Sequence, residues 1–197
     1  MAGYNNDLQN QISELESILF LNKELYSIIE KASNLDLPNY YIGAGCIAQT
    51  IWNFQTGNDL IFGISDIDFV YYDSNDLSFE SENATIDKVR SIIMTPGSFE
   101  LDIKNQARVH LWYKEHFGYD IEPYDSIESA INTWPTTATS IGVRKENNIL
   151  KVYAPFGLND LFGMVVRANK AQITEEIYVQ KVQKWISKWP TLSITPW

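Results

Sequence analysis

The stretch of sequence that decides the fold reads Ile64-Ser-Asp-Ile-Asp-Phe-Val-Tyr-Tyr72. Its β-branched and aromatic residues favour a β-strand. Side chains alternate between the two faces of a strand, so Asp66 and Asp68 fall on the same face. A carboxylate in an otherwise apolar strand is costly to bury unless it lies at a cleft or binds a cation. The sequence therefore predicts a strand that presents two carboxylates to one site.

A short strand and a glycine turn precede this stretch. Tyr40 to Ile42 is apolar and ends at Gly43-Ala-Gly45, after which residues 46–54 show helical spacing. Glycine has no Cβ, so the backbone at Gly43 and Gly45 can come close to a phosphate, and the free N–H groups at a helix start favour an anion. We therefore expect a phosphate-binding turn here. The alternative is a tight connection between a strand and a helix that binds no ligand.

A second carboxylate-bearing strand follows. The segment from Phe99 to Ile103 has the pattern of a strand in which Asp102 lies between Leu101 and Ile103, and Glu100 on the same face is the alternative carboxylate. If the two strands are neighbours, Asp66, Asp68 and Asp102 bring three anions together, and their repulsion calls for a cation. Mg²⁺ takes oxygen ligands and keeps substrate phosphates as further ligands. The pattern predicts a site for two Mg²⁺ ions and a triphosphate.

Composition limits the partners and the setting of the chain. The 25 acidic and 15 basic side chains give a net charge of −10, the wrong sign for binding the phosphates of a nucleic acid. We therefore expect no nucleic-acid partner. A single cysteine, Cys46, allows no internal disulfide and fits a reducing compartment. The polar beginning of the chain and its short apolar runs predict a cytoplasmic protein with no membrane partner.

Hydrophobic spacing predicts the remaining elements. Helices are expected over residues 6–32, 46–54, 86–93, 105–117, 124–134, 157–167 and 174–189, and strands over 40–42, 64–72, 99–103, 139–143 and 149–153. The helix over 86–93 is expected to stop at Pro96-Gly97, and the last helix to be capped by Thr174. A chain of 197 residues suits one core. We expect a single domain, 1–197, with an N-terminal helix (1–35), a core (36–105) and a C-terminal half (106–197) that forms one wall of a cleft.

Basic residues after the third carboxylate are candidates for binding phosphate. Asn105 stands at the start of the helix expected over 105–117, where it can act as a cap. Arg108 and His110 lie about 200° apart around that helix, so they cannot both face one cleft. We favour Arg108, because a guanidinium binds phosphate oxygens through two hydrogen bonds, and the alternative for it is an ion pair. A buried structural role is expected for His110. Further candidates for a positive patch are Arg144, Lys151 and Arg167.

These motifs resemble the signature of the DNA polymerase beta-like nucleotidyltransferase superfamily. Its glycine-rich turn, Asp-hydrophobic-Asp pair and third carboxylate are similar to Tyr41-Ile-Gly-Ala-Gly45, Gly63-Ile-Ser-Asp-Ile-Asp68 and Leu101-Asp-Ile103. The likeness extends to a bacterial family of uncharacterised nucleotidyltransferase-like proteins of this length. It is carried by Asn105-Gln-Ala-Arg-Val-His-Leu-Trp112, Ala154-Pro-Phe-Gly-Leu-Asn-Asp-Leu161, Val166-Arg-Ala-Asn169 and the ending from Trp189-Pro190 to Pro196-Trp197. The segment between Gly45 and Asp66 is longer than this resemblance implies.

The resemblance implies an α/β (α+β) fold, with a small mixed sheet flanked by helices and a mostly helical C-terminal half. It implies that the catalytic and Mg²⁺-binding residues are Asp66, Asp68 and Asp102, and that the nucleotide-binding residues are Gly43, Gly45, Ser65, Asn105 and Arg108. The expected reaction moves a nucleoside monophosphate from an NTP such as ATP to a hydroxyl of a small-molecule or protein acceptor, with release of pyrophosphate. The alternatives are a non-catalytic nucleotide- or metal-binding regulatory module and a metal-dependent phosphohydrolase.

Overall fold

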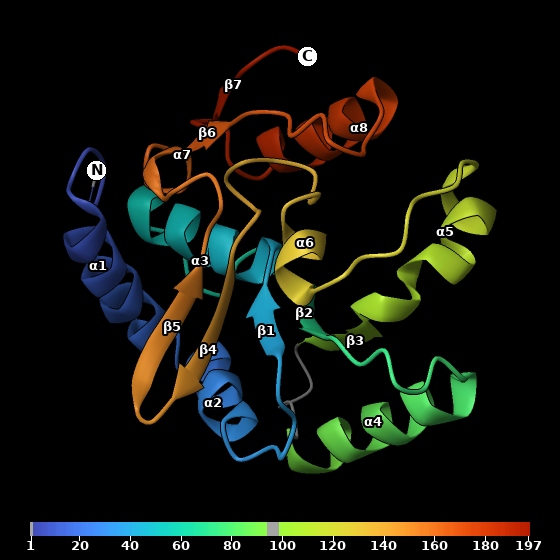
Figure 1. Cartoon of the computed structure of the whole chain (residues 1–197). Helices are drawn as coiled ribbons and strands as arrows, with labels where there is room; N and C mark the ends of the chain where they lie inside the picture. The colour runs from blue at the N-terminus through green and yellow to red at the C-terminus, as the bar shows by residue number, and fades with distance from the viewer. Residues whose placement is uncertain (1, 94–98) are drawn as a thin grey trace.

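A five-stranded mixed sheet forms the centre of the molecule (Figure 1). The structure is a computed structural model, and it describes residues 2–93 and 99–197. The strand order is β3-β2-β1-β4-β5, and a second sheet pairs β6 with β7. The strands are β1 Tyr40–Gly43, β2 Asp66–Tyr71, β3 Glu100–Asn105, β4 Gly142–Glu146, β5 Ile149–Tyr153, β6 Val165–Val166 and β7 Ser193–Ile194. The expected α/β class, with a mixed sheet flanked by helices, is confirmed.

The register of the sheet brings the two carboxylate-bearing strands together. β2 runs parallel to β3, with Asp68 opposite Asp102. β1 runs antiparallel to β2, with Gly43 opposite Asp68, so the end of β1 lies beside the carboxylates. β4 pairs with the other edge of β1, and Gly142 stands opposite Gly43. The expectation that the strands of Asp68 and Asp102 are neighbours is confirmed.

Helices cover both faces of the sheet. They are α1 Leu8–Leu21, α2 Lys23–Ala32, α3 Gly45–Thr56, α4 Phe79–Ile92, the 3₁₀ turn η1 Gln106–Arg108, α5 Val109–Phe117, α6 Ile127–Ile131, α7 Asn159–Phe162 and α8 Glu175–Ile186. None of the helices in the described ranges, 2–93 and 99–197, is long and apolar enough to cross a membrane.

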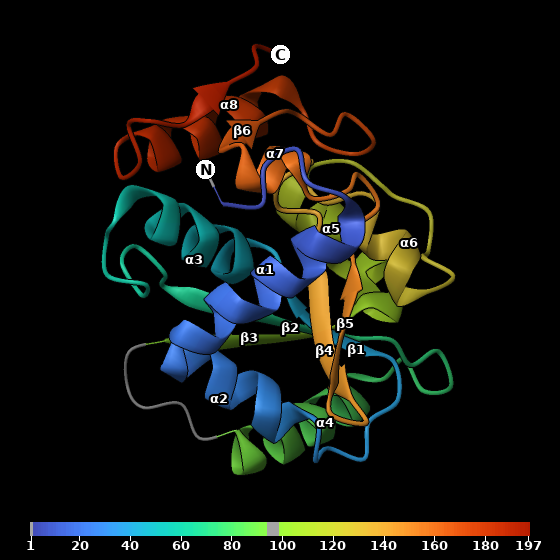
Figure 2. The same cartoon turned by 90° about the vertical axis from the view of Figure 1, so that its left-hand side faces the viewer.

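The two faces of β2 have different neighbours. Ile67, Phe69 and Tyr71 point into the main core, which also contains buried residues of α1, α2, α3 and α4. Val70 alternates to the other face and belongs to a smaller apolar cluster with Ile127 of α6. Figure 2 shows α1 and α2 at the front of the molecule, with β2 and β3 behind α1. Asp66 and Asp68 share the face of Val70, so the sheet presents them on the less covered side.

Several helices have other bounds than the sequence pattern predicts. The helix expected over 6–32 is two helices, because Asn22 lies between them and its side chain accepts a hydrogen bond from the N–H of Leu25. α4 begins before residue 86, since Ser78 caps it. The helix expected over 157–167 is present only as α7. Beyond α7 the expectation is wrong, because Met164 has a positive φ of 55° and the strand β6 follows.

The C-terminal part of the chain also contributes to both sheets. The strands expected over 139–143 and 149–153 are present as β4 and β5, and they extend the central sheet beyond β1. α6 is shorter than the helix expected over 124–134, and Trp189 lies beyond the end of α8. The capping of α8 by Thr174 is confirmed. The helix stop expected at Pro96-Gly97 lies outside the described residues.

Candidate functional site

The structure brings the three carboxylates of the sequence pattern to one place. Asp66 is the first residue of β2 and is exposed, Asp68 follows on the same face, and Asp102 stands beside Asp68 on β3. Burial raises the pKa of Asp68 to about 7, and the negative charges of Asp66 and Asp102 act in the same direction. Both causes favour the neutral acid, and a cation bound beside Asp68 would favour the ionised carboxylate instead.

Two lysines already offset part of this charge. Lys104, two residues after Asp102 on β3, forms an ion pair with the Asp102 carboxylate. Lys181 projects from α8, and its charge, like that of Lys104, lowers the pKa of Asp68 against the larger effect of burial. Burial lowers the pKa of Lys181 itself, while Asp68 and Asp66 oppose that shift. The site therefore mixes both signs of charge.

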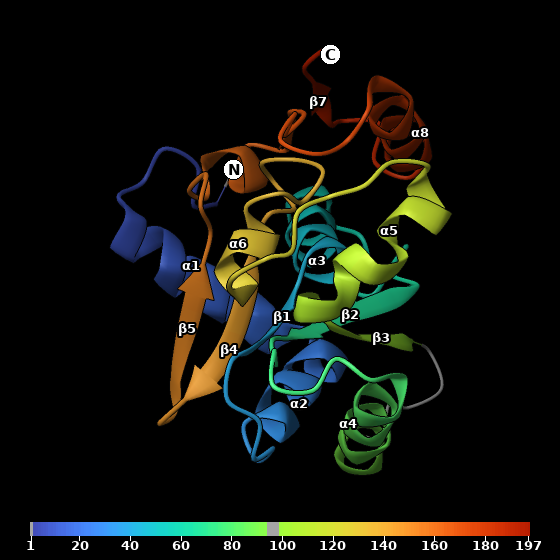
Figure 3. The same cartoon turned by 45° about the vertical axis from the view of Figure 1, so that its right-hand side comes forward.

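Two adjoining cavities meet at Asp68. The charged cavity, of about 230 Å³, is lined by Ala44, Gly45, Gln49, Asp66, Asp68, Trp134, Pro135, Thr139, Lys181, Lys184 and Trp185. The aromatic cavity, of about 320 Å³, is lined by Asp68, Val70, Lys104, Gln106, Val109, Trp112, Tyr113, Phe117, Tyr124, Thr133, Trp134, Pro135, Gln172, Ile173, Ile177 and Lys181. Figure 3 shows α5, α6 and α8, which surround this side of the sheet. Four residues line both cavities, so they are two parts of one cleft.

Sequence reasoning missed the lysines of this cleft. Lys181 follows Tyr178 by three residues and precedes Trp185 by four, and both aromatic residues are buried. Residues three and four apart share a helix face, so this spacing places Lys181 on the buried side of α8. That signal was present in the sequence. Lys184 and Lys104 carry no comparable signal, because their positions depend on which elements pack together.

The cations that we expected to form a positive patch lie elsewhere. The Arg144 guanidinium stacks over the ring of Tyr41, 4.8 Å from its centre. Lys151 stands opposite Arg144 in the β4–β5 pairing. Arg167 pairs with Asp160 at 3.1 Å. The expected patch of Arg144, Lys151 and Arg167 does not contribute to the lining of either cavity.

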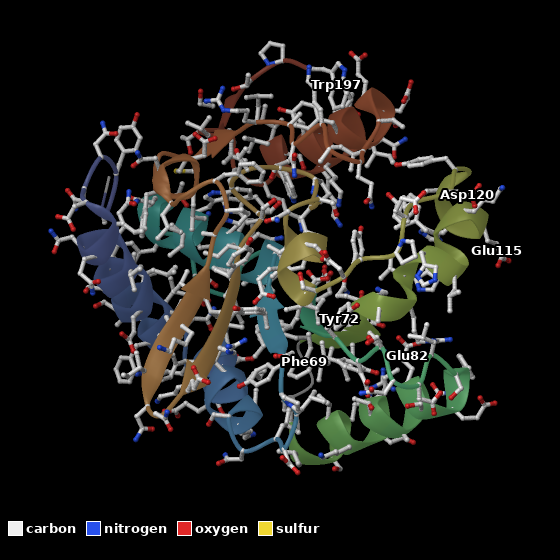
Figure 4. All side chains as sticks on the ribbon, viewed as in Figure 1. Phe69, Tyr72, Glu82, Glu115, Asp120 and Trp197 are labelled. Atoms are coloured by element: carbon white, nitrogen blue, oxygen red, sulfur yellow. The ribbon has the colours of Figure 1, made fainter. Side chains whose placement is uncertain are left out.

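Arg108 and Asn105, which we expected to contact a nucleotide, have partners within the protein. The buried Arg108 guanidinium forms an ion pair with Glu82 of α4, labelled in Figure 4, and donates to the carbonyl of Leu77 at 2.8 Å. The Asn105 amide donates to the carbonyl of Asp73 at 2.8 Å and accepts from the N–H of Asp73. Neither residue lines the charged cavity or the aromatic cavity. Both bind the loop that precedes α4. The role of Asn105 as a cap is confirmed.

The residues of the glycine turn differ in burial, because Gly43 is buried and Ala44 and Gly45 are partly exposed. A Cβ on Gly43 would lie 2.3 Å from the carbonyl oxygen of Ile141, so this glycine is required by the chain's own backbone. Gly43 lines neither cavity. Ala44 has φ 55° and ψ −127°, a conformation that side chains rarely adopt and that costs roughly 1–3 kcal/mol. Gly45 begins α3, whose first turn has no side-chain cap, and it lines the charged cavity.

Ser65 and Cys46 have local roles beside the aspartates. The Ser65 hydroxyl donates to the Asp66 carboxylate and lines neither cavity. The buried Cys46 thiol donates to the carbonyl of Gly43 at 3.1 Å. Burial raises the pKa of this thiol well above its usual range, and the charges of Asp68 and Asp66 add to the shift. Cys46 is therefore a poor nucleophile.

The fit of a metal ion depends on Asp66 and Asp68. Within residues 2–93 and 99–197, no group of three or more His, Cys, Asp and Glu side chains is arranged to hold a metal ion. The carboxylate of Asp102 is paired with Lys104. Mg²⁺ commonly uses one or two carboxylates together with substrate phosphates. The oxygen ligands of Asp66 and Asp68 fit that pattern, whereas Asp102 must first release Lys104.

Known proteins are similar to this chain over most of its length. A family model described as "Nucleotidyltransferase" matches residues 30–194. A solved structure, described with the words "the NMR structure of the protein reveals a CCA-adding enzyme head domain", superposes with a TM-score of 0.74. The two sequences are 22% identical, and the match covers 94% of this chain and 96% of that one, so the likeness shows the fold. A search among curated proteins finds no significant match.

Proposed function

The chain belongs to the nucleotidyltransferase family, and from that premise we propose that it moves a nucleoside monophosphate from an NTP to an acceptor hydroxyl, with release of pyrophosphate. The observation that carries the proposal is the register that sets Asp68 beside Asp102, with Asp66 two residues before Asp68 on the same strand. The raised pKa of Asp68 supports it, because burial and the charges of Asp66 and Asp102 both disfavour the ionised carboxylate, and a bound cation would stabilise it.

The proposed roles follow the geometry of the cleft. Asp66 and Asp68 would hold Mg²⁺ together with phosphate oxygens, and Asp102 would hold a second ion if Lys104 released it. When bound, the metal polarises the phosphoryl oxygens and makes the attacking hydroxyl a better nucleophile. Lys181 neutralises the phosphate chain. The other chain groups proposed to face the triphosphate are Lys184 and the N–H groups at the start of α3, near Gly45.

The acceptor proposed here is a small molecule or a protein. The net charge of −10 weakens attraction to a polynucleotide, although the similar solved structure is described as a CCA-adding enzyme head domain. In this proposal residues 1–197 act as one domain, and residues 106–197 supply the cleft wall through α5, α6 and α8. The buried free thiol of Cys46 suits a reducing, cytoplasmic setting.

The Lys104–Asp102 ion pair favours a second candidate, a regulatory module that binds nucleotide without transferring it. A lysine held on the third carboxylate opposes the binding of a second cation there. Such a module would bind an NTP at Asp66 and Asp68 and release no pyrophosphate.

The first experiment measures thermal stabilisation of the metal-free protein by ATP, GTP, CTP and UTP, each with and without Mg²⁺. Ligand binding to the folded state raises the melting temperature by mass action. We expect an Mg²⁺-dependent rise that is lost in the double variant Asp66→Asn with Asp68→Asn. Glu115→Gln, a change of an exposed carboxylate on α5, is the matched control and should keep the rise.

The second experiment follows the products from an NTP labelled at its α-phosphate. The acceptors are pooled hydroxylated small molecules, the protein itself and an RNA. Pyrophosphate release with label on a small molecule or protein supports the proposal, and label on RNA replaces the proposed acceptor. Binding without pyrophosphate supports the module, while orthophosphate release indicates a phosphohydrolase. No thermal shift with any nucleotide would refute a nucleotide site at Asp66 and Asp68.

A further inference from the structure

The aromatic cavity contains a buried amide that has no partner in the protein. Gln106, at the start of η1, lines this cavity and is only 5% exposed. The backbone carbonyl of Gln106 accepts a hydrogen bond from the N–H of Val109. Its side-chain amide makes no hydrogen bond in the described part of the chain. This amide therefore has a donor and an acceptor free for a ligand in the cavity.

Two tyrosine hydroxyls of the aromatic cavity are already engaged. The Tyr124 hydroxyl lies 2.9 Å from the Thr133 hydroxyl and donates to the Gln172 amide oxygen at 2.8 Å. The Tyr113 hydroxyl lies 3.2 Å from the hydroxyl of Tyr119. These bonds fix the aromatic walls in place. Gln106, by contrast, is a buried lining residue whose side-chain amide is free to form hydrogen bonds with a ligand.

The two cavities of the cleft suit the two parts of a nucleotide, its phosphate chain and its base. The charged cavity offers Lys181, Lys184 and the uncapped start of α3, which suit an anionic phosphate chain. The aromatic cavity offers the rings of Trp112 and Trp134, and an aromatic ring stacks on such surfaces. Asp68 and Lys181 line both cavities, so they stand where the two halves of the ligand would join.

We propose that the aromatic cavity holds the base of the bound NTP and that Gln106 selects the base through its amide. This inference rests on the proposed nucleotide-binding function and deepens it. The Gln106 amide supplies one N–H donor edge and one oxygen acceptor, which match the paired donors and acceptors on the edge of a nucleobase. Charged lining groups of this cavity lie near the carboxylates, as Asp68, Lys104 and Lys181 do, which leaves an uncharged surface along α5 for an uncharged base.

The test compares nucleotides with a ligand that has no base. Calorimetry measures the Kd of ATP, GTP, CTP, UTP and inorganic tripolyphosphate, all with Mg²⁺, for the wild-type protein, Gln106→Leu and Gln106→Asn. Gln183→Leu, a change of an exposed glutamine on α8, is the matched control. Gln106→Leu keeps the volume and removes the hydrogen bonds, and Gln106→Asn keeps the amide but withdraws it from the cavity.

The expected result is a loss of base discrimination. Both Gln106 variants should bind the preferred nucleotide about tenfold more weakly, equivalent to ~1.4 kcal/mol, and bind tripolyphosphate within about twofold of wild type. The control should match wild type for every ligand. Unchanged nucleotide preference in either folded variant, or an equal loss for tripolyphosphate, would overturn the base pocket alone. If the wild-type protein shows no measurable binding of tripolyphosphate or of any nucleotide, the proposed function fails and this inference fails with it.

Discussion

Replacing Asp68 by asparagine should stabilise the metal-free protein at alkaline pH. The pKa of Asp68 is about 7 in the folded protein, against an ordinary value of 3.8. A carboxyl group whose folded pKa is raised binds its proton more tightly in the folded state. Its contribution to stability is therefore complete below about pH 4 and is lost as the pH rises through about 7. Asparagine cannot ionise, so the variant avoids this loss.

The size of the effect follows from the pKa shift. One pKa unit corresponds to about 1.36 kcal/mol, which sets an upper bound of about 4 kcal/mol for Asp68. Water reaches part of this half-buried side chain, and solvent screening reduces the expected gain to roughly 2 kcal/mol at pH 8. For a chain of this size that gain raises Tm by about 4–8 °C.

The assay is urea denaturation followed by tryptophan fluorescence, at pH 4 and at pH 8, with a chelator present. The difference between Asp68→Asn and wild type should be near zero at pH 4 and about 2 kcal/mol at pH 8. Glu115→Gln serves as the control and should show no such dependence on pH, because Glu115 is exposed on α5. A difference that is the same at both pH values would refute the reasoning that burial and neighbouring carboxylates raise the pKa of Asp68.

Three further substitutions test other parts of the structure. Arg108→Ala removes one partner of a buried ion pair and should lower the unfolding free energy by about 3 kcal/mol while leaving nucleotide affinity unchanged; a weaker Kd in the folded variant would return Arg108 to the site. Lys181→Ala removes a cation that lowers the pKa of Asp68, so ¹³C NMR titration should find that pKa above about 7, and an unchanged value would contradict their proximity. Gly43→Ala brings a methyl group against a backbone carbonyl and should cost about 1–3 kcal/mol in denaturation. Its control is Gly57→Ala, where the added Cβ meets nothing within 4 Å and only the positive φ costs about 1 kcal/mol; equal losses would contradict the clash at Gly43.

The sheet and its carboxylate face were predictable because their signals are local. Alternation along β2 depends on backbone geometry within a few residues, so the shared face of Asp66 and Asp68 could be derived before any packing was known. The same applies to the start of α3 after β1 and to the Thr174 cap of α8. Helix ends were less predictable, as Asn22 shows, because a single capping hydrogen bond interrupts an otherwise continuous apolar pattern.

The partners of individual side chains could not be predicted from the sequence. Arg108 looked suited to a phosphate, yet the packing of η1 against α4 gives it a carboxylate instead. Gly43 looked suited to a ligand, yet the neighbouring loop comes within reach of its missing Cβ. Both outcomes depend on elements distant in the chain. A long-range contact is set by how whole elements pack, which no local pattern records.

The sequence by itself determined the nucleotidyltransferase-like motif and the direction in which its first two carboxylates point, since both depend on residue type and short spacing. The tertiary structure alone decided that Asp102 faces Asp68 and that Lys104 neutralises it. It also placed Lys181 at the carboxylates and left the amide of Gln106 without a partner in a cavity. The physical reason is that charge and hydrogen-bond complementarity depend on distances through space, and only folding sets those distances.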